Sequence, residues 1–416
     1  MFDRDRWVEI FEALSKNKVR TVLAAFGVTW GMIMLIIMMG AGQGLQNGIM
    51  SEFRNSATNS LYLWTQATSM PYKGFKRGRR FNLEFEDKDA LETQVDGLAL
   101  VCPRNQLGGY RGSNNVIRGM NTGAFTVYGD IPEIIKIDKK PISMGRFLNS
   151  QDQAGSRKVC VIGDRVRQVL FEKGEDPLGE SIEINGVFFK VIGVFQTNRK
   201  GEDSDEDSQS IFIPISTFGR AFNYGNRVGW FAMMAADGQS IIALKDDIYR
   251  VLNDRHSVHP EDMRAFGSWN MEEEYNEIQS VFAGIKGLSL FVGIFSLLAG
   301  AIGISNIMLV VVKERTKEIG IRRALGASPW NVKFQIILES VVLTSIAGII
   351  GIICGVWLLE VVDKNFGNQP EFLHPSVTFG LVFSCFLFLI LIGVIAGLLP
   401  ASRATSVSPV NALHSE

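Results

Sequence analysis

The chain has 416 residues, and its 42 basic and 43 acidic side chains leave a formal net charge of -1. This near balance argues against a nucleic-acid-binding protein, which depends on a strongly basic surface, so no nucleic-acid partner is expected. At 46% hydrophobic residues the chain is also too apolar to be intrinsically disordered. These averages suit an ordinary soluble protein, but the charges are distributed very unevenly along the chain.

Four long segments contain no Asp, Glu, Lys or Arg: residues 21–51, 287–312, 340–359 and 372–402. Elsewhere charged residues make up about 28% of the positions, slightly more than in typical soluble domains. A helix needs roughly 20 apolar residues to cross a hydrocarbon layer, and each segment is long enough. We therefore predict four transmembrane helices. The first is too long for the apolar core of a signal peptide, which favours a permanent anchor.

The basic residues of the short connections predict the orientation, because Lys and Arg near helix ends are retained on the cytoplasmic side. With four helices, the N-terminal segment, the connection between the second and third helices, and the tail lie on one side. Their basic residues are Arg4, Arg6, Lys16, Lys18, Arg20, Lys313, Arg315, Lys317, Arg322, Arg323, Lys333 and Arg403. The short loop on the other side carries only Lys364. Both termini are therefore expected in the cytoplasm.

The long insert between the first two helices has the pattern of a folded α+β domain. Asn185-Gly186 separates two apolar runs, which is a strong signal for a type I′ hairpin. Asp164 is expected to cap a helix that runs through Leu170. The other expected elements are strands at 60–65, 159–162 and 230–235, helices at 86–95 and 240–252, and a helix from residue 271 that continues into the second membrane helix.

The expected fold is a multi-pass α-helical membrane protein with four transmembrane helices and a large α+β periplasmic domain between helices 1 and 2. The segments in chain order are a cytoplasmic interfacial helix at 1–20, a transmembrane helix at 21–45, the periplasmic domain with stalk helices at 46–286, a transmembrane helix at 287–312, a cytoplasmic coupling segment at 313–333, a transmembrane helix at 334–360, a periplasmic loop at 361–376, a transmembrane helix at 377–400 and a cytoplasmic tail at 401–416.

No residue cluster favours a catalytic or metal site. The acidic run at 202–208 lacks the glycine and distal glutamate of an EF-hand loop, so we interpret it as a flexible loop. His256 and His259 stand without an HExxH or CxxC motif and indicate a surface turn. Whether Cys102 and Cys160 form a disulfide stays open at this point. The sequence contains no Gly-Lys dipeptide and hence no Walker A loop.

The connection at residues 313–328, KERTKEIGIRRALGAS, is expected to stay helical while becoming charged. Glu318 and Arg322 stand four residues apart in the favourable order. Gly326 is expected to end this helix, and Ser328 and Pro329 to start the next one as N-cap and first residue. Two interpretations stay open for this charged bracket: a loop that obeys the charge rule, or a docking site for a partner that moves the attached helices.

The bracket and the terminal PASRATSVSPVNAL at 400–413 resemble the permeases of MacB-type ABC transporters, a group that includes the FtsX-like proteins. Residues 13–31 and 159–195 resemble the same family. Two features depart from the pattern. The ATPase that is fused to MacB itself is absent, and Ser408 and His414 replace an acidic and a basic residue of the terminal motif.

The resemblance implies a homodimer, or a heterodimer with a similar permease, in the bacterial inner membrane. Two copies of a separate cytoplasmic ABC ATPase would bind ATP and Mg²⁺, and this non-catalytic chain would bind no cofactor. The implied mechanism is mechanotransmission, with export of a periplasmic drug, peptide or other small compound through a periplasmic adaptor and an outer-membrane duct. The alternatives are a lipoprotein-releasing transporter and an FtsX-like regulator of a periplasmic cell-wall hydrolase.

Carried onto this sequence, the resemblance also implies the residues that couple the chain to the ATPase. They are Lys313, Glu314, Arg315, Glu318, Gly320, Arg322, Arg323 and Gly326. The N-terminal segment carries Trp7, Ile10, Phe11 and Leu14 at helical spacing, which predicts a helix in the membrane interface. Apart from Glu339, the apolar cores of the four helices contain no Asp, Glu, Lys or Arg, so no ion relay is expected there.

Overall fold

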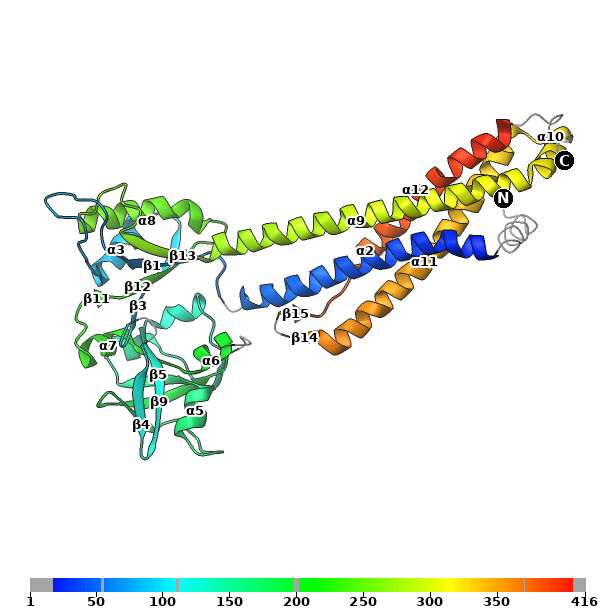
Figure 1. The fold of residues 1–416 in the computed structure, drawn as a ribbon. Coiled ribbons are helices and arrows are strands. Elements are labelled where there is room, and N and C mark those ends of the chain that lie inside the picture. The colour runs from blue at the N-terminus through cyan, green and yellow to red at the C-terminus, as the bar shows by residue number, and fades with distance from the viewer. Residues whose placement is uncertain (1–17, 54–55, 110–111, 198–201, 370, 407–416) are drawn as a thin grey trace. The chain divides into compact units, whose positions relative to one another are not determined.

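The computed structural model describes residues 18–53, 56–109, 112–197, 202–369 and 371–406 (Figure 1). The chain divides into two compact units, and two of its long helices have residues in both. The helical unit comprises Met1–Ile49 and Ser280–Glu416, and the periplasmic unit comprises Met50–Gln279.

The helical unit is built from four long helices, each long and apolar enough to cross a membrane. They are α2 (Lys18–Phe53), α9 (Met271–Glu314), α11 (Pro329–Phe366) and α12 (Phe379–Ser406). The short helix α10 (Thr316–Ala324) connects α9 to α11, and the strands β14 (Asn368–Gln369) and β15 (Phe372–Leu373) form a hairpin between α11 and α12. The prediction of four spanning helices is confirmed.

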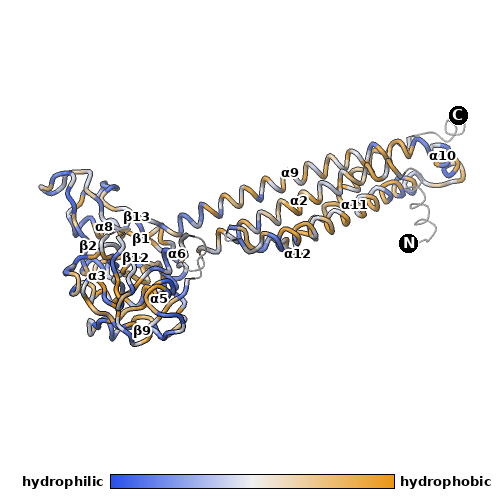
Figure 2. The backbone as a smooth tube through the Cα atoms, turned by 60° about the horizontal axis from the view of Figure 1, so that its bottom comes forward, coloured by the Kyte–Doolittle hydropathy of each residue, from blue (hydrophilic) through white to orange (hydrophobic). Residues whose placement is uncertain are grey.

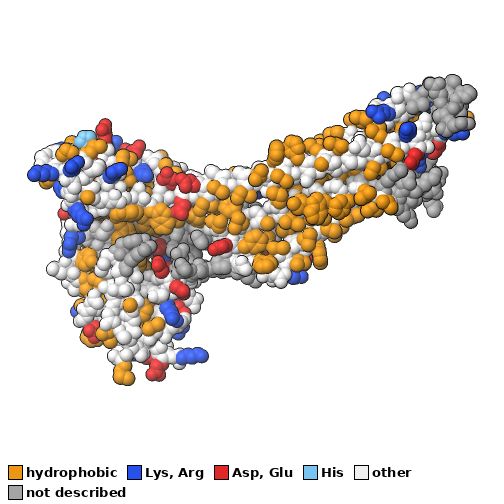
Figure 3. All heavy atoms as spheres, in the orientation of Figure 1, with side chains coloured by type: hydrophobic (Ala, Val, Ile, Leu, Met, Phe, Trp, Pro, Cys, Tyr) orange, Lys and Arg blue, Asp and Glu red, His pale blue; other side chains and the backbone are white. Residues whose placement is uncertain are grey.

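These helices extend beyond the predicted membrane segments, because hydropathy marks the hydrocarbon layer whereas helical hydrogen bonding continues into water. The helix α9 is continuous from Met271, as predicted. Hydrophobic residues recur along all four long helices (Figure 2), and hydrophobic side chains cover much of the face of these helices that Figure 3 shows. About half of the side-chain surface of Leu391, Ile395 and Leu398 is exposed on α12. Such a surface suits lipid and not water.

Glycines set the contacts between these helices. A Cβ atom at Gly393 or Gly397 of α12 would come within 2.9 Å of the Cα atom of Val341 or Ile337 in α11. In the same way, a Cβ atom at Gly300 of α9 would come within 2.7 Å of a backbone nitrogen of α2. Small residues allow this close approach, which is the usual way that membrane helices associate.

The periplasmic unit has two lobes. The sheet lobe contains β1 (Ser60–Thr65), the first part of β3 (Leu98–Gln106), β12 (Trp230–Ala235) and β13 (Phe266–Asn270) in the order β3-β12-β1-β13. Its helices are α3 (Phe85–Gln94) and α8 (Ile241–His256), and a two-stranded ribbon joins β2 (Leu83–Glu84) to β11 (Arg227–Val228). Leu61 and Leu63 alternate along β1 and are buried in one core with Leu91 of α3 and Ile248 of α8.

The ring lobe contains strands whose pairings close on themselves. The order is β5-β4-β8-β9-β7-β10, and β10 pairs in turn with β5. The strands are β4 (Asn114–Arg118), β5 (Asn121–Asp130), β7 (Val159–Gly163), β8 (Ser181–Ile184), β9 (Val187–Phe195) and β10 (Ser210–Pro214), with β6 (Ile142–Gly145) paired to β9. Its helices are η1 (Pro132–Lys136), α4 (Ser150–Ala154), α5 (Asp164–Leu170), α6 (Glu202–Ser208) and α7 (Ile215–Ala221). Closure leaves each ring strand paired on both sides.

The two lobes share the strand β3. Leu98 to Arg104 pair with β12, whereas Asn105 and Gln106 pair with β5 of the ring. At this junction the buried Arg104 guanidinium donates to both carboxylate oxygens of the buried Asp130, with N–O distances of 2.6 and 2.9 Å. A bidentate, fully desolvated ion pair of this kind keeps its geometry only while both partners are present.

Several local predictions for this unit are confirmed and three are wrong. The hairpin at Asn185-Gly186 forms, and both residues have positive φ angles. The acidic run forms α6 instead of a loop, and its Asp207 pairs with the buried Lys140. Gly163, and not Asp164, is the N-cap of α5. His256 does not lie in a surface turn, because it ends α8 and contacts the buried Asp87 at 2.8 Å. Cys102 and Cys160 are buried free thiols.

Candidate functional site

Residues 313–328, the charged bracket of the coupling segment, form a tight helical corner between α9 and α11. The helix α9 ends at Glu314, and the Thr316 hydroxyl lies within hydrogen-bonding distance of the carbonyl oxygens of Val312 and Lys313, at 3.1 and 2.8 Å. The helix α10 follows and ends at its C-cap Leu325. Gly326 then adopts a φ of +99°, a conformation that favours glycine.

The start of α11 completes the corner as predicted. The Ser328 hydroxyl oxygen accepts a hydrogen bond from the backbone N–H of Asn331 at 3.3 Å, and Pro329 occupies the first helical turn, where its missing N–H costs nothing. The chain therefore reverses direction within a few residues, and all the backbone between α9 and α11 is either helical or held in a cap.

A network of polar side chains ties α10 to α11. Glu339 of α11 is only 3% exposed, and the Arg315 guanidinium lies 3.6 Å from its carboxylate. The Gln335 amide donates to the same carboxylate at 3.5 Å, and Arg322 donates to the amide oxygen of Gln335 at 3.3 Å. A buried carboxylate is costly unless it is paired. Arg315 therefore stabilises Glu339, the one acidic residue in the apolar core of the third membrane helix.

Further contacts fix α10 against the end of α12. The Arg323 guanidinium donates to the carbonyl oxygen of Thr405 at 2.9 Å, and Gly320 is buried. On the outer side, Arg322 and Glu318 form the predicted ion pair at 2.7 Å. The segment is therefore attached to two membrane helices by side chains as well as to α9 by the chain itself.

The structure places the eight implied coupling residues at three levels of burial: Gly320 is buried, three arginines are half-buried and four residues are exposed. Arg315, Arg322 and Arg323 are half-buried and make contacts within their own unit. The exposed members are Lys313, Glu314, Glu318 and Gly326. Trp7, Ile10, Phe11 and Leu14 lie outside the described residues.

Sequence reasoning missed an apolar component of this surface. Ile321 on α10 is 44% exposed, and Leu325 at its C-cap is 84% exposed; on α11, Trp330 is 70% and Phe334 is 47% exposed. Both pairs are spaced by four residues and so lie on one side of their helices. In the sequence, the only sign of this apolar surface is the spacing of four residues within each pair, in and beside a charged segment. Exposed apolar side chains flanked by charge are typical of a protein–protein interface.

The fold and this corner define a class of membrane protein. It has one membrane helix, a large external α+β domain and three further membrane helices, and a short charged helix, α10, connects α9 to α11. Among the described residues no cluster of His, Cys, Asp and Glu could hold a metal ion.

The chain belongs to the MacB-type family of ABC transporter permeases. The MacB-like periplasmic core domain matches residues 21–251, and the FtsX-like permease C-terminal domain matches residues 290–409. The comparison confirms the family that the sequence motifs indicated.

Several curated proteins resemble the chain along almost all of its length. The macrolide export ATP-binding/permease protein MacB of Bdellovibrio bacteriovorus is 31% identical over 98% of this chain and 61% of its own length. The pyoverdine export ATP-binding/permease protein PvdT of Pseudomonas entomophila is 28% identical over 96% of this chain and 58% of its own length. The chain thus spans about 60% of the length of these relatives.

Solved structures also match part of the chain. The periplasmic region of MacB from Actinobacillus actinomycetemcomitans matches 56% of this chain and 97% of its own, with 21% identity and a TM-score of 0.44. The extracellular domain of the ABC-type transporter YknZ matches 51% of this chain and 100% of its own, with 18% identity and a TM-score of 0.42.

Proposed function

We propose that this chain is the membrane subunit of an ATP-driven exporter and that a separate cytoplasmic ATPase drives it through the coupling segment. The observation that carries the proposal is the corner at residues 313–328, which is attached to α9, α11 and α12 and exposes Ile321 and Leu325 beside Lys313 and Glu318. A partner that binds these side chains would move three membrane helices together.

The proposed mechanism is mechanotransmission. The helix α9 runs without interruption from the coupling segment to the last strand of the sheet lobe, so displacement at Glu314 would be carried along the helix to Met271. A continuous hydrogen-bonded helix is stiff along its axis. The nearly uncharged cores of the membrane helices agree with this mechanism, because they offer no polar route for a solute. The substrate, a drug, peptide or other small compound, would be taken up in the periplasm.

The proposed assembly contains two such permeases, either identical or similar, and two ATPase copies that hold ATP and Mg²⁺. A periplasmic adaptor and an outer-membrane duct would complete the export route. Both termini would lie in the cytoplasm, because the basic residues of the short connections gather on that side. Support for the ATPase comes from the names of the relatives, which combine an ATP-binding part and a permease part in one protein.

The test is Leu325→Glu in permease reconstituted with its ATPase. We expect ATPase stimulation and transport to fall at least tenfold, because a charge replaces an apolar side chain at the centre of the docking surface. Folding should be retained, since Leu325 is 84% exposed. The matched control is Met120→Glu, which places the same charge at a residue that is 99% exposed in the periplasmic unit. Normal ATPase stimulation by the Leu325→Glu permease would overturn the proposal.

A second variant tests the ion pair. Exchanging its members, Glu318→Arg with Arg322→Glu, keeps an oppositely charged pair on the helix but reverses the charges that a partner meets. Such an exposed pair contributes only about 0.3–0.5 kcal/mol to stability, so membrane insertion should be unaffected. The exchange also removes the hydrogen bond from Arg322 to Gln335, and Gln335→Ala is the control for that loss. A loss of transport with normal insertion, together with normal transport in Gln335→Ala, would indicate a docking defect.

A further inference from the structure

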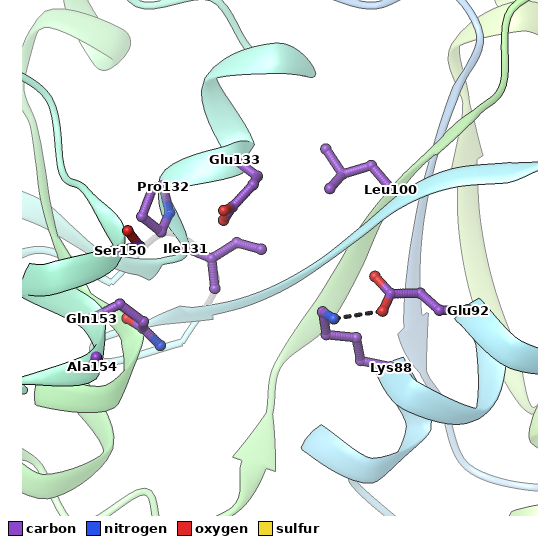
Figure 4. A pocket seen from close by; sticks show the side chains of 9 residues that line it. All are labelled: Lys88, Glu92, Leu100, Ile131, Pro132, Glu133, Ser150, Gln153 and Ala154. Atoms are coloured by element: carbon purple, nitrogen blue, oxygen red, sulfur yellow. Dashed lines mark hydrogen bonds and ion pairs between the residues drawn. The ribbon is translucent and has the colours of Figure 1, made fainter.

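A cavity of about 430 Å³ lies between the two lobes of the periplasmic unit (Figure 4). The sheet lobe contributes Lys88 and Glu92 from α3 and Leu100 from β3. The ring-lobe wall comes from the end of β5, η1 and α4: Ile131, Pro132, Glu133, Ser150, Gln153 and Ala154. The volume lies within the range of pockets that hold small organic ligands. Nothing in the coupling mechanism uses this cavity.

The wall on the sheet lobe is built on a helix that is fixed at its start. The backbone N–H of Glu84, the N-cap of α3, donates to the carboxylate of Asp87 at 2.8 Å. Asp87 is fully buried, and its carboxylate also accepts hydrogen bonds from Arg255 at 2.6 Å and His256 at 2.8 Å, both on α8. Lys88 and Glu92 follow on this anchored helix, so the backbone that carries them is fixed before any ligand arrives.

The opposite wall repeats this construction. In α4 the N-cap Asn149 and the third residue Asp152 exchange hydrogen bonds at 2.9 and 3.1 Å in a capping box. Asp152 is fully buried, and Arg146 binds both of its carboxylate oxygens at 2.6 and 3.1 Å. Gln153 and Ser150 belong to this short helix, and the Gln153 carbonyl oxygen accepts from the Ser216 hydroxyl at 2.6 Å. Both walls are therefore preorganised, although they belong to different lobes.

The charges of the lining select the kind of ligand. Lys88 is already neutralised by Glu92 at 2.7 Å. The half-buried Glu133 faces the cavity from the other wall and receives no hydrogen bond or ion pair from any described residue. The lining thus carries one excess negative charge. A partly buried carboxylate favours a nearby positive charge, while the apolar side chains of Leu100 and Ile131 favour an apolar body.

We infer that this cavity is a binding site for a small organic cation, a protonated amine that carries an apolar group. The ammonium group pairs with Glu133, and the apolar group packs on Leu100 and Ile131. Because such a ligand contacts both lobes, its binding holds them at a fixed separation. The site is defined by the periplasmic unit alone, so it stands whether or not the coupling segment binds an ATPase.

The experiment measures binding of three probes that share one apolar body: phenylbutylamine, phenylbutanol and phenylbutyrate. Calorimetric titration uses the full chain in lipid nanodiscs at neutral pH, with empty nanodiscs as the blank. We expect the amine to bind at least tenfold more tightly than the alcohol or the carboxylate. Equal affinities for the three probes, or no binding of the amine in the millimolar range, would overturn the inference.

Variants locate the site. Glu133→Gln keeps the shape of the side chain and should reduce amine affinity at least tenfold, to that of the alcohol. The matched control, Glu261→Gln, removes the charge of another carboxylate without an ion pair, in an exposed turn away from the cavity, and should leave affinity unchanged. Ala154→Trp, at an exposed edge of the cavity, should abolish binding by filling it. Full amine affinity in both Glu133→Gln and Ala154→Trp would place the site elsewhere.

Discussion

The interactions that stabilise the interior of the helical unit differ from those that stabilise the interior of the periplasmic unit. In the helical unit, glycines such as Gly397 bring helix backbones together, and the polar contacts described above gather at the coupling segment. In the periplasmic unit, buried charges such as the Arg104–Asp130 pair organise the interior. Lipid offers no hydrophobic gain between helices, so packing decides there. Water supplies that gain to the periplasmic unit, and buried polar groups add specificity.

The largest effect should follow from Asp130→Ala. Burial alone would lower the pKa of Arg104, but the charge and hydrogen bonds of Asp130 have the larger effect and raise it. Removing Asp130 therefore leaves a buried guanidinium without its ion-pair partner. We expect the free energy of unfolding of the periplasmic unit to fall by about 3–5 kcal/mol. Hydrogen exchange of β3 and β5 measures the loss. The control Asp237→Ala, at an exposed turn, should change it by less than about 0.5 kcal/mol. A loss below about 1 kcal/mol for Asp130→Ala would mean that the pair is not essential.

A smaller effect is expected in the helical unit from Gly397→Leu. Its Cβ atom would stand 2.9 Å from the Cα atom of Ile337, so α12 must move away from α11. Overpacking of this kind costs about 1–3 kcal/mol, which resistance to unfolding in a detergent titration can measure. Gly380→Leu on the same helix is the control, because no atom lies within 4 Å of its Cβ position. If both variants unfold alike, close approach does not stabilise this unit.

The third prediction concerns acid, which should affect the periplasmic unit first. Burial alone would raise the pKa of Asp87 and Asp152, but hydrogen bonds from His256 to Asp87 and from Arg146 to Asp152 lower both below the usual value of an aspartate. A lowered pKa contributes stability above that usual value, and the contribution is lost as the pH falls through the lowered pKa. Limited proteolysis between pH 5 and pH 2 should detect opening of this unit at a higher pH than opening of the helical unit. In Asp87→Asn the cleavage of the periplasmic unit should depend less on pH. Simultaneous opening of both units would contradict this.

Much of the architecture could be predicted from local sequence. The charge-free runs identified the four membrane helices, Asn185-Gly186 identified a hairpin, and Ser328-Pro329 identified the start of α11. Each of these signals depends on residues that are close together in the chain. The fold class and the family followed from them.

The wrong predictions depend on partners that are far away in the sequence. The acidic run is helical where Asp207 meets Lys140, and His256 is half-buried because its ring contacts Asp87 on α3. Closure of the ring by β5 and β10 has no local signature either. At the candidate site, the sequence motif indicates which residues take part but not which of their side chains face the helices and which face out. Only the structure shows that Arg315 and Arg323 face inward while Leu325 faces out.

The division of β3 between the lobes also determines how the periplasmic unit can fold. The ring lobe comes from one continuous stretch of chain between β3 and β12, whereas the sheet lobe pairs Ser60 with Met234 across that stretch. Closing so long a loop is entropically costly until the intervening chain is compact. We therefore expect the ring to form first and the sheet lobe to be completed once the ring brings β12 alongside β3. We expect a chain that emerges from the membrane to expose the unpaired strand β1 during this interval, which makes β1 a segment at risk of aggregation.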